Sequence, residues 1–389
     1  MRSRNRNTIS SGEVHQWALS WLTDSMQLKD RGPKCQAVTI WNIVLRAAAQ
    51  TISVYAACRD LAKAPSDTAV MGALEAGLPK TLAVLEKRLN AALVDPLPQR
   101  LQRRNWTMAI DWHLVPYYGQ PKHSRNEIYY GKPRQGTTKF HAYGTVCIVS
   151  YGVRYTVAVT WVRRHETTVT ALNRLLATIR AKGLKIQRLL LDRAFFNVSV
   201  VHLLQEQQIP FVMPVMFRGR IPKKRRRLTG LHWIRRQKAG CYSHTLKNKK
   251  QIVSVSVYVA YRTHKNRKDN KHKQQKLLFA AWRVRGCPQE IRELYRTRFG
   301  IETSYRQGRQ ARIYTCTRDP HLRLLFVVVA LLLRNVWVWI HQTLLAEGHG
   351  DSMTLHQEKL RLRRMLAWIA LEVVAQLHDG STPYVELDS

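Results

Sequence analysis

The order of the regular elements between residues 106 and 217 constrains the fold more than any other feature of this chain. Apolar runs of strand length, rich in Val, Ile, Thr and Tyr, alternate there with runs of helical spacing. In chain order these are a strand, a two-stranded meander, a helix, a strand, a helix and a strand, at residues 107–111, 139–150, 153–163, 168–182, 186–191, 198–207 and 209–217. Strands that alternate with helices in this way predict an α/β domain with a mixed sheet.

Two acidic residues directly follow strand-like runs in this region. Asp111 ends the run 107–111, and Asp192 comes directly after the three leucines that end the run 186–191. Because ligands converge at the carboxyl ends of strands in α/β sheets, we expect both carboxylates at one edge of the sheet. An aspartate at a strand end is also common as a cap or an ion-pair partner, so neither residue identifies a site by itself. His113 shares the strand face of Asp111 by alternation, and we interpret it as a hydrogen-bonded neighbour of that carboxylate.

A third carboxylate lies on a helix that is predicted to begin at Pro288, since Pro is well placed in a first helical turn. At 100° per residue, one face of this helix carries a phenol, a carboxylate and two guanidiniums, from Tyr295, Glu302, Arg298 and Arg309. A single carboxylate among cations suits a metal ion that lies next to a phosphate.

Asp111, Asp192 and Glu302 are therefore predicted to be catalytic metal ligands. Mg²⁺ prefers hard oxygen ligands and keeps several waters, so three carboxylates and the phosphate oxygens of a substrate suffice. Two Mg²⁺ ions about 3.5–4 Å apart can activate the attacking oxygen and stabilise the leaving oxygen of a phosphodiester. The three acids predict a two-metal phosphodiester enzyme.

The charge of the chain indicates the partner. There are 64 Lys and Arg residues against 25 Asp and Glu among 389 residues, a formal net charge of +39, which favours nucleic acid as the ligand. The densest basic run is expected to contact phosphates, with a solvated loop as the alternative; it consists of Lys223, Lys224, Arg225, Arg226 and Arg227. Arg193, directly after Asp192, is assigned to DNA binding, and an ion pair with an acid is the alternative.

The chain divides into five predicted parts. Residues 1–100 form a helical N-terminal domain that binds DNA, and residues 101–217 form the first part of the α/β core. A β-rich basic insertion follows at 218–285, the core resumes at 286–345 with the third acid, and 346–389 form a C-terminal helical segment. Within the first part, residues 53–61 and 70–78 read as helix, turn, helix. They predict either a helix-turn-helix that holds DNA or a plain helical bundle that packs on the core.

Other ligands and compartments are not indicated. The six cysteines form no CxxC pair, so zinc is not predicted, and the N-terminus has no apolar segment typical of a signal peptide. The apolar run 324–333 is too short to span a bilayer and predicts a buried helix. We expect a cytoplasmic, nucleoid-associated protein with no membrane partner.

The acids and their neighbours resemble the insertion-sequence transposases of the DDE class from bacteria and archaea. The similarity lies in Ala-Ile-Asp111-Trp-His, in Leu-Leu-Leu-Asp192-Arg-Ala-Phe-Phe, and in the helix motif Tyr295-x2-Arg298-x3-Glu302. The motif continues as x6 and a basic residue, which resembles the subgroup with a Y-x2-R-x3-E-x6-K signature. The resemblance covers about residues 105 to 345. This chain differs at the last position, where Arg309 replaces the Lys of that subgroup, so the charge is kept and the geometry changes.

The resemblance implies a fold and an activity. It implies an RNase H-like mixed sheet interrupted by the β-rich insertion, two Mg²⁺ ions with Mn²⁺ as a substitute, and cut-and-paste transposition of double-stranded DNA in a homodimeric complex. Tyr295, Arg298 and Arg309 would bind a phosphate near the cut site. Trp233 and Trp282 lie in the insertion, where one of them could stack a flipped base; packing is the alternative for each.

Two other functions remain open at this point. One is a catalytically inactive, transposase-derived DNA-binding protein, against which the intact set of three acids argues. The other is an RNase H-like nuclease or resolvase that only hydrolyses. A helical N-terminal part and a large basic insertion suit a protein that holds two DNA ends, which favours transposition.

Overall fold

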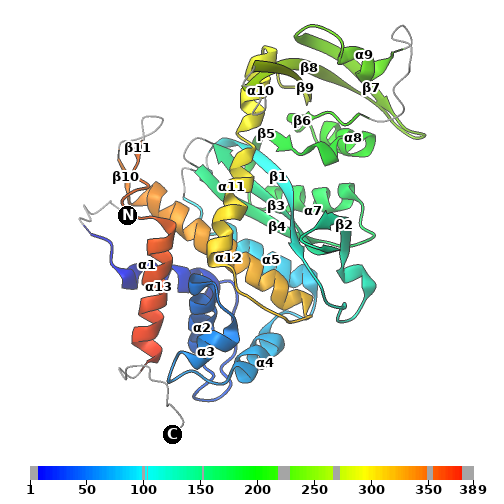
Figure 1. Cartoon of the computed structure of the whole chain (residues 1–389). Helices are drawn as coiled ribbons and strands as arrows, with labels where there is room; N and C mark the ends of the chain where they lie inside the picture. Colours follow the sequence, from blue (N-terminus) through cyan, green and yellow to red (C-terminus); the bar gives the residue numbers. More distant parts are fainter. Residues whose placement is uncertain are drawn as a thin grey trace.

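A nine-stranded mixed sheet forms the centre of the molecule (Figure 1). The structure is a computed structural model that describes residues 8–98, 101–102, 104–150, 153–217, 228–265, 272–347 and 354–378. The strand order is β2-β3-β1-β5-β6-β9-β8-β7, and β4 pairs with β3. The bounds are β1 Asn105–Pro116, β2 Tyr129–Arg134, β3 Thr137–Ser150, β4 Val153–Val162, β5 Lys185–Leu191, β6 Phe211–Pro214, β7 Gly240–Lys247, β8 Ile252–Lys265 and β9 His272–Trp282. Strands β1, β5 and β6 are parallel, and the other pairs are antiparallel, which confirms the predicted mixed α/β fold.

The two faces of the sheet bury different sets of side chains. On β1, Met108 and Ile110 belong to the large core, whereas Ala109 belongs to a smaller core on the opposite face. The smaller core is covered by α10 (Pro288–Arg296) and α11 (Phe299–Gly308), which contribute Ile291 and Ile301. Figure 1 shows these two helices running end to end along the sheet toward α12. Strand alternation therefore decides which residues of β1 face the helix of the third acid.

Strand β4 is an edge of the sheet, and two buried asparagines bind the free backbone groups of two of its residues. Asn90 of α5 (Leu82–Val94) accepts from the Val159 N–H at 2.7 Å and donates to its carbonyl at 2.9 Å. Asn335 of α12 (Pro320–Thr343) does the same for Thr156, at 3.0 and 2.8 Å. Uncovered edge strands invite pairing with other chains, so these side chains both attach the helices to β4 and protect part of this edge.

The β-rich segment within residues 218–285 continues the central sheet. Strand β9 pairs antiparallel with β6 from Phe211↔Trp282 to Pro214↔Phe279, and β8 and β7 follow outward. A short helix, α9 (Gly230–Ile234), precedes β7. Trp282 stacks on Phe211 with ring centroids 6.5 Å apart and serves packing, whereas Trp233 is 47% exposed.

The N-terminal helices pack together with the C-terminal one. They are α1 (Ser11–Thr23), α2 (Ala37–Gln50), α3 (Val54–Arg59), α4 (Asp67–Gly77) and α5. Helix α13 (Leu362–Leu377) lies beside α1 and α2, and Asn42 donates to Gln376 at 2.8 Å (Figure 1). The predicted helix, turn, helix is present as α3 and α4, whose apolar side chains enter the large core, as in a helical bundle.

Helix α12 is long and apolar enough to cross a membrane by length and composition alone. However, 89% of its most apolar stretch is buried inside the protein. Asp319 caps its N-terminus by accepting from the His321 N–H at 2.7 Å, and Pro320 occupies the first turn. Its hydrophobicity is thus explained by its place in the core.

The remaining elements are α7 (Thr168–Ala181), α8 (Val198–Glu206), the 3₁₀ turns η1 (Arg125–Glu127), η2 (Arg193–Phe195) and η4 (Arg309–Ala311), and the short pair β10 (Ala346–Glu347) and β11 (Thr354–Leu355).

Candidate active site

Asp111 on β1 and Asp192 directly after β5 lie next to each other, since β1 and β5 are parallel neighbours. The β1–β5 register ends at the pair Ile110↔Leu191, and each aspartate is the next residue on its chain. Alternation puts both on the face of Ala109 and Leu190, which belong to the smaller core under α10 and α11. The prediction that Asp111 ends its strand is wrong, because β1 continues to Pro116 by pairing with β3 after its pairing with β5 has ended.

The carboxylate of Asp111 is held in a largely buried position. Its Oδ1 accepts from the Trp112 N–H at 2.8 Å, and its side chain is 21% exposed. Burial raises the pKa of Asp111 to about 6, while the charge of Arg298 opposes that rise. The nearby charges of Asp192 and Glu302 raise the pKa further, so the three acids are close enough to act on one another.

The helix of the third acid is interrupted. Residues Thr297 and Arg298 form a turn between α10 and α11, and i→i+3 bonds replace the α-helical ones: Arg298 N to Tyr295 O at 3.0 Å and Ile301 N to Arg298 O at 2.9 Å. The prediction of one continuous helix is therefore wrong. A Cβ on Gly300 would lie 3.2 Å from Cγ1 of Val149, so a glycine lets the helix approach β3 closely at this point.

Arg298 connects two of the acids. Its Nη1 donates to Asp111 Oδ2 at 3.4 Å, and its Nη2 donates to Glu302 Oε1 at 2.5 Å. The residue is only 5% exposed, whereas the Glu302 side chain is 50% exposed. Its Nε is buried without a hydrogen-bond partner. The guanidinium is therefore the counter-ion of the acid cluster in this structure.

Tyr295 packs on the other side of Arg298. It is buried in the smaller core with its ring 5.1 Å from that of Phe279, and burial raises its pKa. The Arg298 guanidinium lies 5.6 Å from the centre of the Tyr295 ring, a cation–π contact. Tyr295 thus holds Arg298 against the acids.

The other predicted DNA-binding residues are Arg193, Arg309 and the basic run. Arg193 is exposed in η2, directly after Asp192. Arg309 follows the end of α11 at Gly308, about two helical turns beyond Glu302. The run of Lys223, Lys224, Arg225, Arg226 and Arg227 lies outside the described residues.

Asp111, Asp192 and Glu302 have the chemistry to bind a hard divalent cation such as Mg²⁺, since all three side chains are carboxylates. Among the described residues, no three His, Cys, Asp or Glu side chains are close enough together to hold a metal ion. Asp111 and Glu302 instead share the guanidinium of Arg298. The residue types fit a metal, and the arrangement in this structure is that of an ion-paired cluster.

The matching family model describes a transposase DDE domain and covers residues 103–335, which contain all three acids. The chain belongs to the transposase DDE domain family. The solved structures include a fold of the same kind, described as the cryo-EM structure of piggyBac transposase synaptic complex with hairpin DNA. The similarity covers 96% of this chain and 81% of that chain, with a TM-score of 0.56 and 11% sequence identity. No curated protein matches this chain.

Tyr305 is a residue of this transposase site that the sequence reading missed. Its hydroxyl lies 3.3 Å from the Asp111 carbonyl oxygen, to which it donates, and 2.6 Å from the Thr145 hydroxyl. Its ring stacks on His113 with centroids 4.6 Å apart. The signal was available, because Tyr305 follows Glu302 by three residues and so lies on the same helix face.

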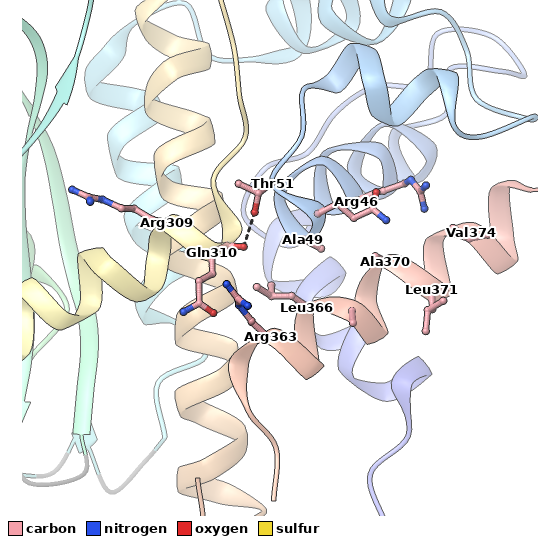
Figure 2. Close-up of a pocket in the computed structure, with 12 residues that line it drawn as sticks. Arg46, Ala49, Thr51, Arg309, Gln310, Arg363, Leu366, Ala370, Leu371 and Val374 are labelled. Carbon is pink, nitrogen blue, oxygen red and sulfur yellow. Dashed lines mark hydrogen bonds between the residues drawn. The ribbon is translucent and has the colours of Figure 1, made fainter. Parts of the chain in front are cut away.

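The end of α11 is tied to the N-terminal part of the transposase. A hollow of about 660 Å³ lies between α2, η4 and α13, and Thr51 donates to the Gln310 carbonyl at 2.9 Å beside it. Figure 2 shows Arg363 in this hollow, whereas Arg309 points away from the other lining residues, toward the sheet. The helix that carries Glu302 is thereby anchored at both ends.

Proposed function

We propose that this DDE-type transposase cuts DNA at the ends of an insertion sequence and joins those ends to target DNA. The proposal rests on the adjacency of Asp111 and Asp192 at the end of the β1–β5 register. Glu302 is linked to Asp111 because Arg298 forms ion pairs with both. Strand ends that converge in this way are where α/β enzymes place reacting groups. The two parallel strands and α11 each supply one carboxylate.

We assign Asp111, Asp192 and Glu302 as ligands of two Mg²⁺ ions, for which Mn²⁺ can substitute. When bound, such ions supply an activated oxygen nucleophile and a stabilised leaving oxygen for phosphodiester chemistry. The residues of the chain position these acids: β1 and β5 fix the two aspartates, and the exposed Glu302 side chain can turn toward them from α11. Arg298 neutralises the acids, and its Nη groups, which bind Asp111 and Glu302 here, can donate to a phosphate oxygen when a metal takes over those carboxylates.

The DNA partner is inferred from charge and from the related structure. A net charge of +39 favours a polyanion, and the piggyBac structure is described as a complex with hairpin DNA. We also propose that the chain belongs to the bacterial and archaeal subgroup with the Y-x2-R-x3-E-x6-K signature, on the spacing of Tyr295, Arg298, Glu302 and Arg309, with Arg in place of Lys. We further propose a homodimer on the DNA and a nucleoid-associated, cytoplasmic location.

The proposal is tested by cleavage of DNA that carries the flanking ends of the element, with Mg²⁺ and the full-length protein. Asp111→Asn, Asp192→Asn and Glu302→Gln should each lower cleavage by at least about 100-fold while end binding stays within a few-fold, because metal ligation and docking use different residues. Glu293→Gln is the matched control, since Glu293 is half-exposed on α10 and pairs with Arg296. Cleavage retained in any acid variant would remove that residue from the metal site, and hydrolysis without strand transfer would indicate a nuclease.

A further inference from the structure

Helix α12 carries a buried arginine, Arg334, that has no counter-ion. Arg334 is 1% exposed, and no Asp or Glu of the described residues acts on its charge. Burial lowers its pKa to about 10, so the guanidinium keeps its charge at pH 7. A buried ion without a counter-ion costs stability, and an apolar side chain of similar size avoids that cost. Stability therefore does not explain why an arginine occupies this position.

The hydrogen bonds of Arg334 join three elements. Its Nε donates to Gln307 Oε1 of α11 at 3.0 Å, its Nη1 donates to the Arg154 carbonyl of β4, and its Nη2 is buried without a partner. The next residue, Asn335, binds both backbone groups of Thr156 on the same edge of β4. Two consecutive residues of α12 thus attach both α11 and β4 to this helix.

The contact of Gln307 with Arg334 lies on the side of α11 that faces away from the acids. Gln307 follows Glu302 by five residues, which places it about 140° around the helix and about 7.5 Å along it. The Glu302 side chain points to Arg298 and is 50% exposed. The contact therefore holds the far side of the helix while Glu302 extends toward Asp111.

The rotation of α11 about its own axis decides where the carboxylate of Glu302 lies. The turn at Thr297 and Arg298 separates α11 from α10, so α10 does not set this rotation. On the sheet side, the Tyr305 hydroxyl lies 2.6 Å from that of Thr145, and on the α12 side Gln307 accepts from Arg334. A carboxylate about 6 Å from the axis moves about 1 Å when the helix turns by about 10°. A displacement of about 1 Å can slow a reaction about 100-fold.

We propose that Arg334 is a positioning residue, which sets the rotation of α11 through Gln307 and so holds Glu302 beside Asp111. The inference rests on the proposed function for the role of Glu302, whereas the anchoring of α11 can be measured without it. Arg334 forms no hydrogen bond with the acids, so its effect on them passes through Gln307 and the helix.

The first measurement is hydrogen exchange of the full-length protein in EDTA, read by mass spectrometry. In Arg334→Met and in Gln307→Ala, we expect the amides of α11 to exchange about tenfold faster than in the wild type, because the helix has lost an anchor. The amides of α7, on the other part of the sheet, should exchange as in the wild type.

The second measurement is the Mn²⁺ concentration at which the rise in melting temperature is half complete. Both variants should need about tenfold more Mn²⁺, because Glu302 is less often in place to bind the ion. The double variant should need no more than either single variant, since the two substitutions break one contact. A side chain with a merely structural role would lower the melting temperature and leave this midpoint unchanged.

Two further variants serve as controls. Gln307→Glu keeps an acceptor for Arg334 and should retain the wild-type midpoint, but it should not restore the midpoint in Arg334→Met. Arg306→Met removes an exposed arginine from the same helix and should change neither measurement. With Mg²⁺ and end DNA, Arg334→Met should cleave about 10–100-fold more slowly while binding the DNA within a few-fold of the wild type.

Gln307→Ala changes only a half-buried side chain, so it covers the case in which Arg334→Met fails to fold. Wild-type exchange of α11 together with a wild-type midpoint in Gln307→Ala would overturn the assignment, and so would additive shifts in the double variant. Unchanged variants of a wild type that binds Mn²⁺ and cleaves remove only the role of Arg334. A wild type that neither binds Mn²⁺ nor cleaves removes the proposed chemistry, and hydrogen exchange still decides whether Arg334 anchors α11.

Discussion

Arg298 and Asp111 form an ion pair across 187 residues of sequence, with Nη1 3.4 Å from Oδ2. The pair joins the turn between α10 and α11 to the middle of β1, and the same guanidinium also binds Glu302. Carboxylates that lie close together and are partly buried repel one another unless a cation is present. Arg298 therefore stabilises the site in the metal-free protein, and this role leads to the first prediction.

Arg298→Met should lower the free energy of unfolding by about 1–3 kcal/mol. Removing one partner of a fully buried ion pair typically costs about 3–5 kcal/mol, and the partial exposure of Asp111 and Glu302 reduces that cost. Urea denaturation in EDTA at pH 7.5 measures it. Arg296→Met is the control, because Arg296 is 61% exposed in its pair with Glu293 and should matter by less than about 0.5 kcal/mol. Equal effects of the two variants would contradict a structural role for Arg298.

Asp111 should make the metal-free protein less stable as the pH rises from about 4 to 7. Its pKa is raised from 3.8 to about 6, so the folded state holds a proton that the unfolded state has released in this range. Stability due to this group is thus full below pH 4 and lost above pH 6, with an upper bound of about 3 kcal/mol at 1.36 kcal/mol per unit. Relative to the wild type, Asp111→Asn should gain stability over the same range in EDTA. A pH-independent difference between the two proteins would show that this carboxyl is not perturbed.

Gly300→Ala and Gly308→Ala should have different effects on the melting temperature. A Cβ at position 300 meets Val149 Cγ1 at 3.2 Å, so either Val149 or α11 has to shift slightly, whereas a Cβ at position 308 has Leu331 Cδ2 at 4.0 Å as its nearest neighbour. In an open helical position, Ala is favoured over Gly by about 1 kcal/mol. We expect Gly308→Ala to raise the melting temperature and Gly300→Ala to leave it unchanged or lower it while reducing cleavage. Full cleavage by Gly300→Ala would mean that the approach of α11 to β3 does not set the position of Glu302.

Replacing all five residues of the basic run, Lys223, Lys224, Arg225, Arg226 and Arg227, by Ser should flatten the salt dependence of DNA binding. Each phosphate neutralised contributes about −0.9 to the log–log slope of affinity against salt, so the slope should fall by several units for all sequences alike. Arg298→Ala should instead impair cleavage more than affinity, since its guanidinium faces the acids. The variants are compared by fluorescence anisotropy at salt concentrations between about 50 and 300 mM. An unchanged slope in the Ser variant would identify the run as a solvated loop.

The sequence by itself was sufficient for the class of fold and for two acids at one sheet edge. The three leucines before Asp192 mark a strand buried on both faces, and the meander and helices around it define a mixed sheet. Period-two alternation also places Asp111 and His113 on one face of β1, because that relationship is local.

Tertiary structure decided where β1 ends, how the third-acid helix is divided, and what Arg298 binds. Strand β1 passes Asp111 because its partner changes from two strands to β3 alone, and no local pattern reports the length of a distant partner. The turn at Thr297 and Arg298 forms where α11 meets Val149, a contact between segments far apart in the chain. The helical period predicts that Arg298 and Glu302 share a face. That Asp111 of β1 lies opposite them follows only from the tertiary structure. Ion pairing depends on long-range distances and on burial, and neither can be predicted from the local periodicity of the sequence.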